Sequence, residues 1–375
     1  MGSLFPPEPD GRAHKLSRMR PPAPFRPVSL FLVLLMIALP LLLVVSDRPL
    51  PVLPEPPWDA PGVVVALGDS TMSGEGAGDY APGTDGEDDN WCHRSSHATV
   101  HQLRVPGVDR TVNLACSGAR AEHVGLGDAV HNTEGSQAEQ LRELAGEYRV
   151  AAIVVAVGAN DDPRFSDVLG HCVRAWFEQD GGHCGETLSP SWEDRVAEMA
   201  PKVRSALADI REVMREHGYP DASYELVLQS YASPIGTRVI PGLRGLAGCP
   251  FRESDTSWMQ RDAVRALSDG LAEVARQARV RFLDLSQAGL DREACSRDDG
   301  EEWFTRLTID WDGLGDDHRA PHAIQESFHP NAEGHAEFGR CLTDFLADGA
   351  RSAACVAGPD GRLTVVPDDR VIDDR

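Results

Sequence analysis

The chain has 375 residues, and 41% of them are hydrophobic, which is enough for one large domain or two ordinary ones. The formal net charge of −23 argues against a protein that binds nucleic acid through a basic face. Such acidity indicates little beyond a soluble, highly charged surface, so function has to be inferred from motifs along the chain.

The first 61 residues are expected to lie outside the globular domain. Residues 1–27 are basic and proline-rich, and residues 28–45 are almost entirely apolar. The apolar run is longer than the roughly 7–15 residues of a signal-peptide core and just long enough to span a bilayer. We therefore predict a cytoplasmic N-terminus and a single-pass membrane anchor at 28–45, with a cleaved secretion signal as the alternative. Residues 46–61 would form a stiff, proline-rich linker, and both alternatives place the remaining chain outside the cytoplasm.

Residues 62–68 begin the expected domain with aliphatic and β-branched side chains, typical of a strand buried on both faces. The strand stops at Gly68-Asp69-Ser70, which would deliver one hydroxyl to the carboxyl edge of a sheet, where open α/β folds bind ligands. Taken alone, the turn fits equally well with Ser70 simply capping the next helix. Asp69 is expected to support the turn by accepting backbone hydrogen bonds.

An acidic, glycine-rich loop at residues 75–90 follows this turn. Several carboxylates close together can bind calcium, but their spacing does not match an EF-hand. We interpret the loop as a solvated surface segment and predict no metal there.

Four more strands and three amphipathic helices are predicted farther along the chain. The strands are expected at 111–116, 150–157, 224–231 and 280–285, and the helices at 192–217, 257–279 and 332–346. Strands that alternate with helices indicate one parallel sheet covered on both faces. We therefore expect a three-layer α/β domain over residues 62–348 with a central five-stranded parallel sheet, followed by an acidic C-terminal tail at 349–375.

All eight cysteines follow the apolar run. They are Cys92, Cys116, Cys172, Cys184, Cys249, Cys295, Cys341 and Cys355. None forms a C-x-x-C pair, so disulfides are a better interpretation than a zinc or redox site. Eight cysteines allow 105 pairings, and the sequence selects none of them; sequential pairing, 92–116, 172–184, 249–295 and 341–355, is the simplest expectation.

Residues suited to acyl transfer follow three of the strands and appear again near the C-terminus. A serine nucleophile such as Ser70 needs a base, and His329 supplies one of suitable pKa. Glu326, three residues earlier, could orient the other ring nitrogen of that histidine. The backbone N–H groups of Ser70 and Gly118, together with the side-chain amide of Asn160, could stabilise the oxyanion.

Three other histidines are given structural interpretations. His335 lies on the predicted closing helix and is expected to be a packing residue. His318 and His322 have a spacing that could suggest a metal, but Pro321 between them interrupts a helix, so a solvated loop is expected.

These blocks resemble the SGNH hydrolases, also called the GDSL family of esterases and lipases, over roughly residues 62–348. The matching blocks are Gly68-Asp69-Ser70, Asn113 to Gly118, Gly158 to Asp161, and Glu326-x-x-His329 followed by Pro330-Asn331. Two further stretches are similar to the secreted, disulfide-bonded branch of the family, Ser73-Gly74-Glu75-Gly76 and Trp91-Cys92-His93-Arg94-Ser95. Glu326 departs from the family's usual D-x-x-H, and in some relatives of this branch a main-chain carbonyl orients the histidine instead.

The resemblance implies a flavodoxin-like fold in which Ser70 is the nucleophile, Gly118 and Asn160 are oxyanion donors, and no cofactor is needed. We expect an extracytoplasmic carboxylic-ester hydrolase that acts on a small ester or a lipid. It should be a monomer attached to a membrane through its N-terminal apolar segment. An acyltransferase or deacetylase of cell-envelope glycans is the first alternative, and a non-catalytic binding module is the second.

Overall fold

The computed structural model describes residues 27–44, 54–178, 181–297, 301–311 and 313–368. The chain divides into two compact units, Met1–Leu53 and Pro54–Arg375. In the first unit, helix α1 spans Pro27–Val44. Within the described ranges, no helix combines the length and the apolar character that crossing a membrane requires. The predicted membrane anchor at 28–45 is therefore unsupported, and the predicted cytoplasmic segment lies almost wholly outside the described residues.

The second unit is built on a seven-stranded sheet with the order β2-β1-β3-β4-β5-β6-β7. The first six strands run parallel to one another, and β7 is antiparallel to β6. The strands are β1 Gly62–Gly68, β2 Arg110–Asn113, β3 Arg149–Ala156, β4 Glu225–Gln229, β5 Arg281–Asp284, β6 Ser352–Ala357 and β7 Leu363–Pro367. The five predicted strands are confirmed as β1 to β5, and so is the α/β class.

The prediction of only five strands was wrong, because the sheet continues into residues expected to form an acidic tail. In β6, Ser352–Ala357, the first four residues are buried, and the strand pairs with β5. The strand β7 then folds back on β6 after a turn. Small apolar residues in a short segment give little sequence signal, and their burial depends on a neighbouring strand from elsewhere in the chain.

Helices flank the strands along the chain. The α-helices are α2 Ser70–Ser73, α3 Ala121–Val124, α4 Gln137–Glu147, α5 Phe165–Phe177, α6 Cys184–Glu216, α7 Glu253–Trp258, α8 Val264–Ala278 and α9 Ala332–Asp348. A π-helical turn, η4 Met259–Ala263, joins α7 to α8. The 3-10 turns are η1 Glu87–Asp89, η2 Thr99–Gln102, η3 Pro241–Leu243, η5 Gly313–Gly315 and η6 Ala320–His322.

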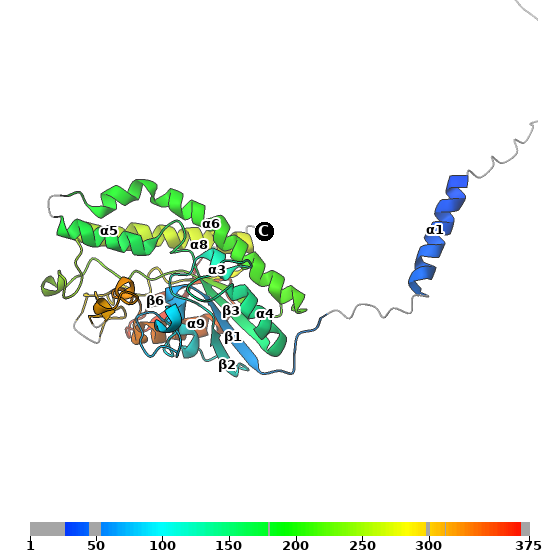
Figure 1. The fold of residues 1–375 in the computed structure, drawn as a ribbon, viewed down its shortest axis with the longest axis horizontal. Coiled ribbons are helices and arrows are strands. Elements are labelled where there is room, and N and C mark those ends of the chain that lie inside the picture. Colours follow the sequence, from blue (N-terminus) through cyan, green and yellow to red (C-terminus); the bar gives the residue numbers. More distant parts are fainter. Residues whose placement is uncertain (1–26, 45–53, 179–180, 298–300, 312, 369–375) are drawn as a thin grey trace, which may run out of the picture. The chain divides into compact units, whose positions relative to one another are not determined.

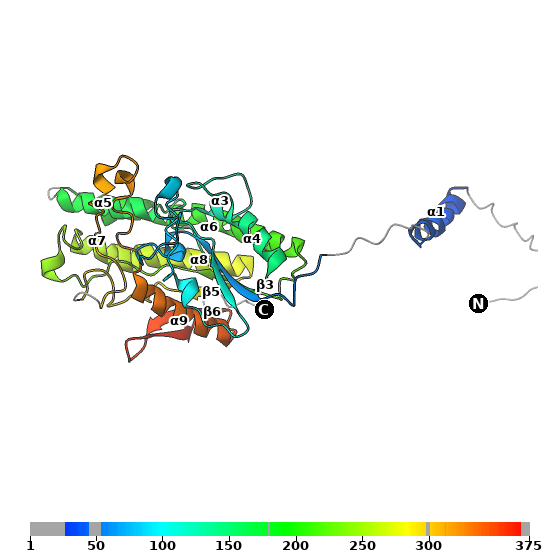
Figure 2. The ribbon, with the colours of Figure 1, turned by 60° about the horizontal axis from the view of Figure 1, so that its bottom comes forward.

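The helices form a layer on each face of the sheet, as the sequence pattern predicts. On one side α6 packs between α4 and α8, and these two helices contact the strands beneath them. On the other side α9 packs against β6, β7 and η2 (Figures 1 and 2). This arrangement leaves the carboxyl ends of the parallel strands open to the loops that follow them, which is where α/β folds bind ligands.

All four disulfides join cysteines in sequential order, so the simplest predicted pairing is confirmed. The bonds are Cys92–Cys116, Cys172–Cys184, Cys249–Cys295 and Cys341–Cys355. Two of them lie where the structure departs from the predicted element bounds. Cys172 in α5 is joined to Cys184, the first residue of α6, and this helix therefore includes residues before the predicted start at 192. Cys341 in α9 is bonded to Cys355 and thereby ties β6 to the domain.

Candidate active site

The turn after β1 depends on a glycine and a buried carboxyl group. Gly68 has φ of +140°, and a Cβ there would lie 2.0 Å from the Ala156 carbonyl oxygen, so a larger residue does not fit. Asp69 caps α2: its carboxyl group accepts hydrogen bonds from the Thr71 N–H at 3.2 Å and the Tyr231 hydroxyl at 2.5 Å. Burial raises the pKa of Asp69 to about 7. The predicted supporting role of Asp69 is thus confirmed.

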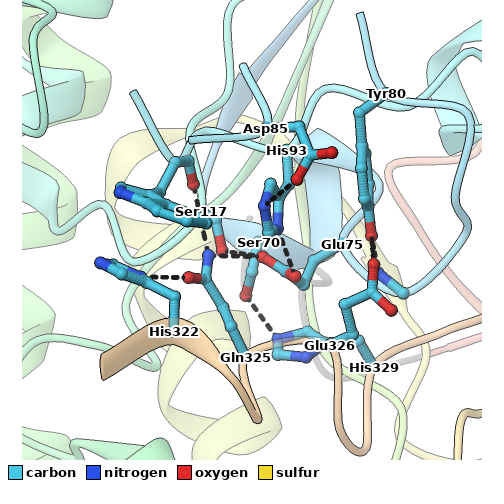
Figure 3. A network of polar contacts seen from close by, with 12 residues as sticks. Ser70, Glu75, Tyr80, Asp85, His93, Ser117, His322, Gln325, Glu326 and His329 are labelled. Atoms are coloured by element: carbon cyan, nitrogen blue, oxygen red, sulfur yellow. Dashed lines mark hydrogen bonds and ion pairs between the residues drawn. The ribbon is translucent and has the colours of Figure 1, made fainter. Parts of the chain in front are cut away.

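Ser70 lies next to His329, although 259 residues separate them in the sequence. Ser70 is 9% exposed, and its Oγ lies 2.9 Å from His329 Nε2 (Figure 3). The Nδ1 of the same ring lies 3.1 Å from the Ser327 carbonyl oxygen. Because a carbonyl oxygen only accepts hydrogen bonds, Nδ1 carries the proton and Nε2 can accept the hydroxyl proton of Ser70. Burial lowers the pKa of His329, which favours the uncharged ring.

Glu326 does not contact His329 in the manner predicted for it. Its carboxylate accepts a hydrogen bond from the Tyr80 hydroxyl at 2.7 Å (Figure 3). Phe328 has φ of +61°, and this backbone turn presents the carbonyl of Ser327, not the carboxylate of Glu326, to the imidazole. The geometry therefore fits the main-chain alternative for orienting the histidine.

The three predicted oxyanion donors, Ser70, Gly118 and Asn160, line one cavity. Gly118 has φ of +79°, and within the described part of the chain neither its N–H nor that of Ser70 meets a protein acceptor. Asn160 Nδ2 donates to the Ala119 carbonyl at 3.2 Å, which leaves the second N–H of that amide available. The structure thus brings Ser70, Gly118, Asn160 and His329 together, as predicted.

Apolar side chains from α5, α8 and the loops near His329 form much of the rest of this cavity. Its volume is about 560 Å³. The main apolar lining residues are Phe165, Leu169, Val173, Val264, Leu267 and Phe304. The polar groups around Ser70 can therefore stabilise a developing negative charge, while the apolar lining excludes water from an apolar group.

The match to known proteins agrees with this geometry. Residues 66–337 match the GDSL-like Lipase/Acylhydrolase family. The chain belongs to this family of serine ester hydrolases.

The GDSL-like chain is also similar to solved structures. A phospholipase A1 from Streptomyces albidoflavus NA297 is 23% identical, with a TM-score of 0.50; the match covers 78% of this chain and 100% of the phospholipase. An extracellular lipase from Streptomyces rimosus is 20% identical, with a TM-score of 0.48, covering 77% of this chain and 100% of the lipase. Est24, a carbohydrate acetylesterase from Sinorhizobium meliloti, is 13% identical, with a TM-score of 0.38 and coverage of 76% and 98%. The first similarity shows a shared fold, and no curated protein matches the chain.

The sequence pattern did not predict the burial of Glu75 and His93 in this GDSL-like hydrolase. Glu75, expected in a solvated loop, is 0% exposed, and its carboxylate lies 2.6 Å from His93 Nδ1. The signal was present in the sequence, because these residues occupy the two stretches that are similar to the secreted branch of the family, 73–76 and 91–95.

Two other histidines discussed above, His335 and His322, contact neighbouring protein side chains. His335 is fully buried, its Nδ1 lies 2.8 Å from Thr99 Oγ1, and burial lowers its pKa to about 3, which confirms a packing role. His322 stacks on Trp91, with ring centroids 4.0 Å apart. Over the described ranges, no group of three or more His, Cys, Asp or Glu side chains is arranged to hold a metal.

Proposed function

We propose that this GDSL-like hydrolase cleaves carboxylic esters outside the cytoplasm, with Ser70 as nucleophile and His329 as general base. The observation that carries the proposal is the 2.9 Å contact between Ser70 Oγ and His329 Nε2. A positioned base is what converts a weakly nucleophilic hydroxyl into an effective one. The carbonyl of Ser327 would hold the ring in the tautomer that accepts the proton.

In the proposed reaction, Nε2 of His329 removes the hydroxyl proton while Oγ of Ser70 attacks the ester carbonyl carbon. The N–H groups of Ser70, Gly118 and Asn160 would stabilise the resulting oxyanion. The ester C–O bond then breaks, and His329 gives its proton to the leaving alcohol. Water, deprotonated by the same histidine, attacks the acyl-enzyme and releases the carboxylic acid, which restores Ser70.

The apolar part of the cavity supports an ester whose acyl group is apolar. The cavity volume of about 560 Å³ lies in the range of about 300–1,000 Å³ usual for small-molecule sites. An acyl chain placed between α5 and α8 would leave its ester carbonyl near Ser70.

Four disulfides within the described chain support export from the cytoplasm. Such bonds persist in oxidising compartments, whereas the cytosol keeps most thiols reduced. We therefore propose that the catalytic domain works outside the cytoplasm, as a secreted protein.

The proposal is tested by labelling the purified protein with a fluorophosphonate probe and measuring hydrolysis of p-nitrophenyl esters. We expect hydrolysis that increases from acetyl toward longer acyl chains, and labelling at Ser70 that abolishes it. Absence of both labelling and hydrolysis would instead favour the non-catalytic binding module. Activity that appears only when a saccharide acceptor is added would favour the acyltransferase.

Replacing Glu326 with glutamine is expected to leave kcat/KM for p-nitrophenyl butyrate within about threefold of wild type. The amide oxygen can still accept the hydrogen bond of Tyr80, and the partner of His329 Nδ1 is a main-chain carbonyl that the substitution does not alter. Steady-state kinetics of purified E326Q measure this. A loss of 100-fold or more with an unchanged melting temperature would mean that the carboxylate orients the histidine after all.

A further inference from the structure

Glu75 is a buried carboxylate that accepts hydrogen bonds from three separate segments of the chain. Its side chain lies 2.6 Å from His93 Nδ1, accepts from the Ser117 hydroxyl, and accepts from Gln325 Nε2 at 2.9 Å. Figure 3 shows this carboxylate between the nucleophile turn and the loop that carries His329.

Two of these contacts, those to Ser117 and Gln325, reach loops that hold parts of the proposed machinery. Ser117 precedes Gly118, the oxyanion donor, and Gln325 belongs to the loop that carries His329. The N–H of Glu75 itself donates to the Ser70 carbonyl at 3.2 Å. The three loops therefore meet at one side chain.

The nucleophile turn and the loop that carries His329 are packed so closely that a displacement of one would displace the other. Gly76, with φ of +82°, is next to the histidine loop, and a Cβ at this position would lie 2.9 Å from His329 Cβ and 3.3 Å from the Glu326 carbonyl oxygen. Loops in such close contact cannot move independently. The hydrogen bonds to Glu75 therefore determine the positions of these loops relative to one another.

The charge of Glu75 is compensated by a histidine. His93 is 4% exposed, its Nε2 lies 3.3 Å from an Asp85 carboxylate oxygen, and its ring stacks on Tyr80 with centroids 4.4 Å apart. Burial by itself would raise the pKa of Glu75 and lower that of His93. Their mutual hydrogen bond and charges reverse both effects, so the pKa of Glu75 falls below its usual value and that of His93 rises. Glu75 is therefore ionised at neutral pH, and its charge favours the protonated form of His93.

We propose that ionised Glu75 is a positioning residue that holds the oxyanion loop through Ser117 and the histidine loop through Gln325 in the arrangement that ester hydrolysis requires. Glu75 does not line the substrate cavity, so it acts through these two residues. The inference rests on the proposed function, since it has meaning only if Ser70 and His329 perform the chemistry.

The carboxylate cannot be replaced by an amide without loss of these contacts. A carboxylate offers two acceptor oxygens, whereas glutamine offers one and turns an NH₂ group toward its neighbours. Glutamine at position 75 would also leave His93 without its anion. The substitution therefore loosens the loops while barely changing side-chain volume.

Glu75 also influences the base itself. The charged and titratable groups facing His329 are Glu75 and His93, and His335 lies nearby. Against the effect of burial, Glu75 raises the pKa of His329, and this influence is larger than the opposite one of His93. Removing the charge of Glu75 therefore lowers the pKa of the base. Because the base must be unprotonated to react, the acid limb of the pH–rate profile should move to lower pH.

The test compares kcat, KM and the pH dependence of kcat/KM for wild type, Glu75→Gln and a matched control, Glu293→Gln. Glu293 is also a buried glutamate, 2% exposed, whose carboxylate contacts Gln260 and does not line the cavity. We expect Glu75→Gln to lower kcat by about 10- to 100-fold, because displaced catalytic groups lose that much. The KM of Glu75→Gln should stay within about threefold of wild type, and the acid limb of its pH–rate profile should move to lower pH. The control Glu293→Gln should keep the wild-type kcat and the wild-type acid limb.

An acid limb at the wild-type position in Glu75→Gln would overturn the inference, and so would an equal fall of kcat in the control. If Glu75→Gln does not fold, as judged by circular dichroism, Ser117→Ala replaces it as the test. That variant keeps the charge, so kcat should fall about fivefold for the lost hydrogen bond, with no movement of the acid limb; a wild-type kcat would overturn the proposal. Failure of the proposed function is recognised separately, by ester hydrolysis that does not depend on Ser70.

Discussion

Replacing Ser70 with alanine is expected to reduce kcat/KM for p-nitrophenyl butyrate by about 10⁴-fold or more. The substitution removes the oxygen that lies 2.9 Å from Nε2 of His329, the proposed general base, and the proposed acyl-enzyme needs that oxygen. The remaining activity would come from substrate binding and the oxyanion donors alone. Initial rates of purified S70A, with enough enzyme to detect a small residual rate, measure the loss.

Ser286→Ala is the matched control for this experiment. Its hydroxyl donates to the Asp284 carboxylate at 2.9 Å at the end of β5, and it does not line the cavity, so we expect activity close to wild type. Full hydrolysis by S70A would rule out Ser70 as the nucleophile. A similar loss in both variants would point to a general effect on folding.

Replacing Asn160 with alanine is expected to lower kcat by about 10²- to 10³-fold, the usual cost of removing one oxyanion donor. The side-chain amide lines the same cavity as Ser70, and one of its N–H groups is bonded to the Ala119 carbonyl while the other is available for the oxyanion. Because the oxyanion develops only in the transition state, KM should change little. Steady-state kinetics with a short p-nitrophenyl ester separate the two parameters.

Gln277→Ala is a suitable control for this variant. It also removes a side-chain amide, which donates to Glu273 Oε1 at 2.6 Å on an exposed part of α8 and does not line the cavity. We expect its kcat to stay within about threefold of wild type. Equal kcat for Asn160→Ala and wild type would remove Asn160 from the oxyanion hole.

Much of the fold and the core of the site could be predicted from the sequence. Strands β1 to β5 carry runs of apolar residues that end in polar turns, and this pattern depends on local composition alone. The pairing of Ser70 with His329 could be anticipated because acyl transfer needs both a nucleophile and a base. The sequential disulfides were the simplest of many possibilities, and the structure has them.

The partner of the histidine could not be predicted from the spacing of residues. Glu326 occupies a position where a carboxylate is expected. Its side chain, however, accepts a hydrogen bond from Tyr80, which is 246 residues away in the sequence. Which group faces Nδ1 depends on the positive φ of Phe328, a backbone conformation that the spacing of residues does not reveal.

By itself, the sequence determined the α/β class, the order of the strands along the chain and the residue types that meet at the carboxyl edge of the sheet. Only the tertiary structure decided that β6 and β7 extend the sheet, that Ser327 supplies the carbonyl next to His329, and that Glu75 is buried. The physical reason is the same in each case. Strand pairing, hydrogen-bond partners and burial depend on contacts between segments far apart in the chain, whereas sequence patterns report mainly on neighbouring residues.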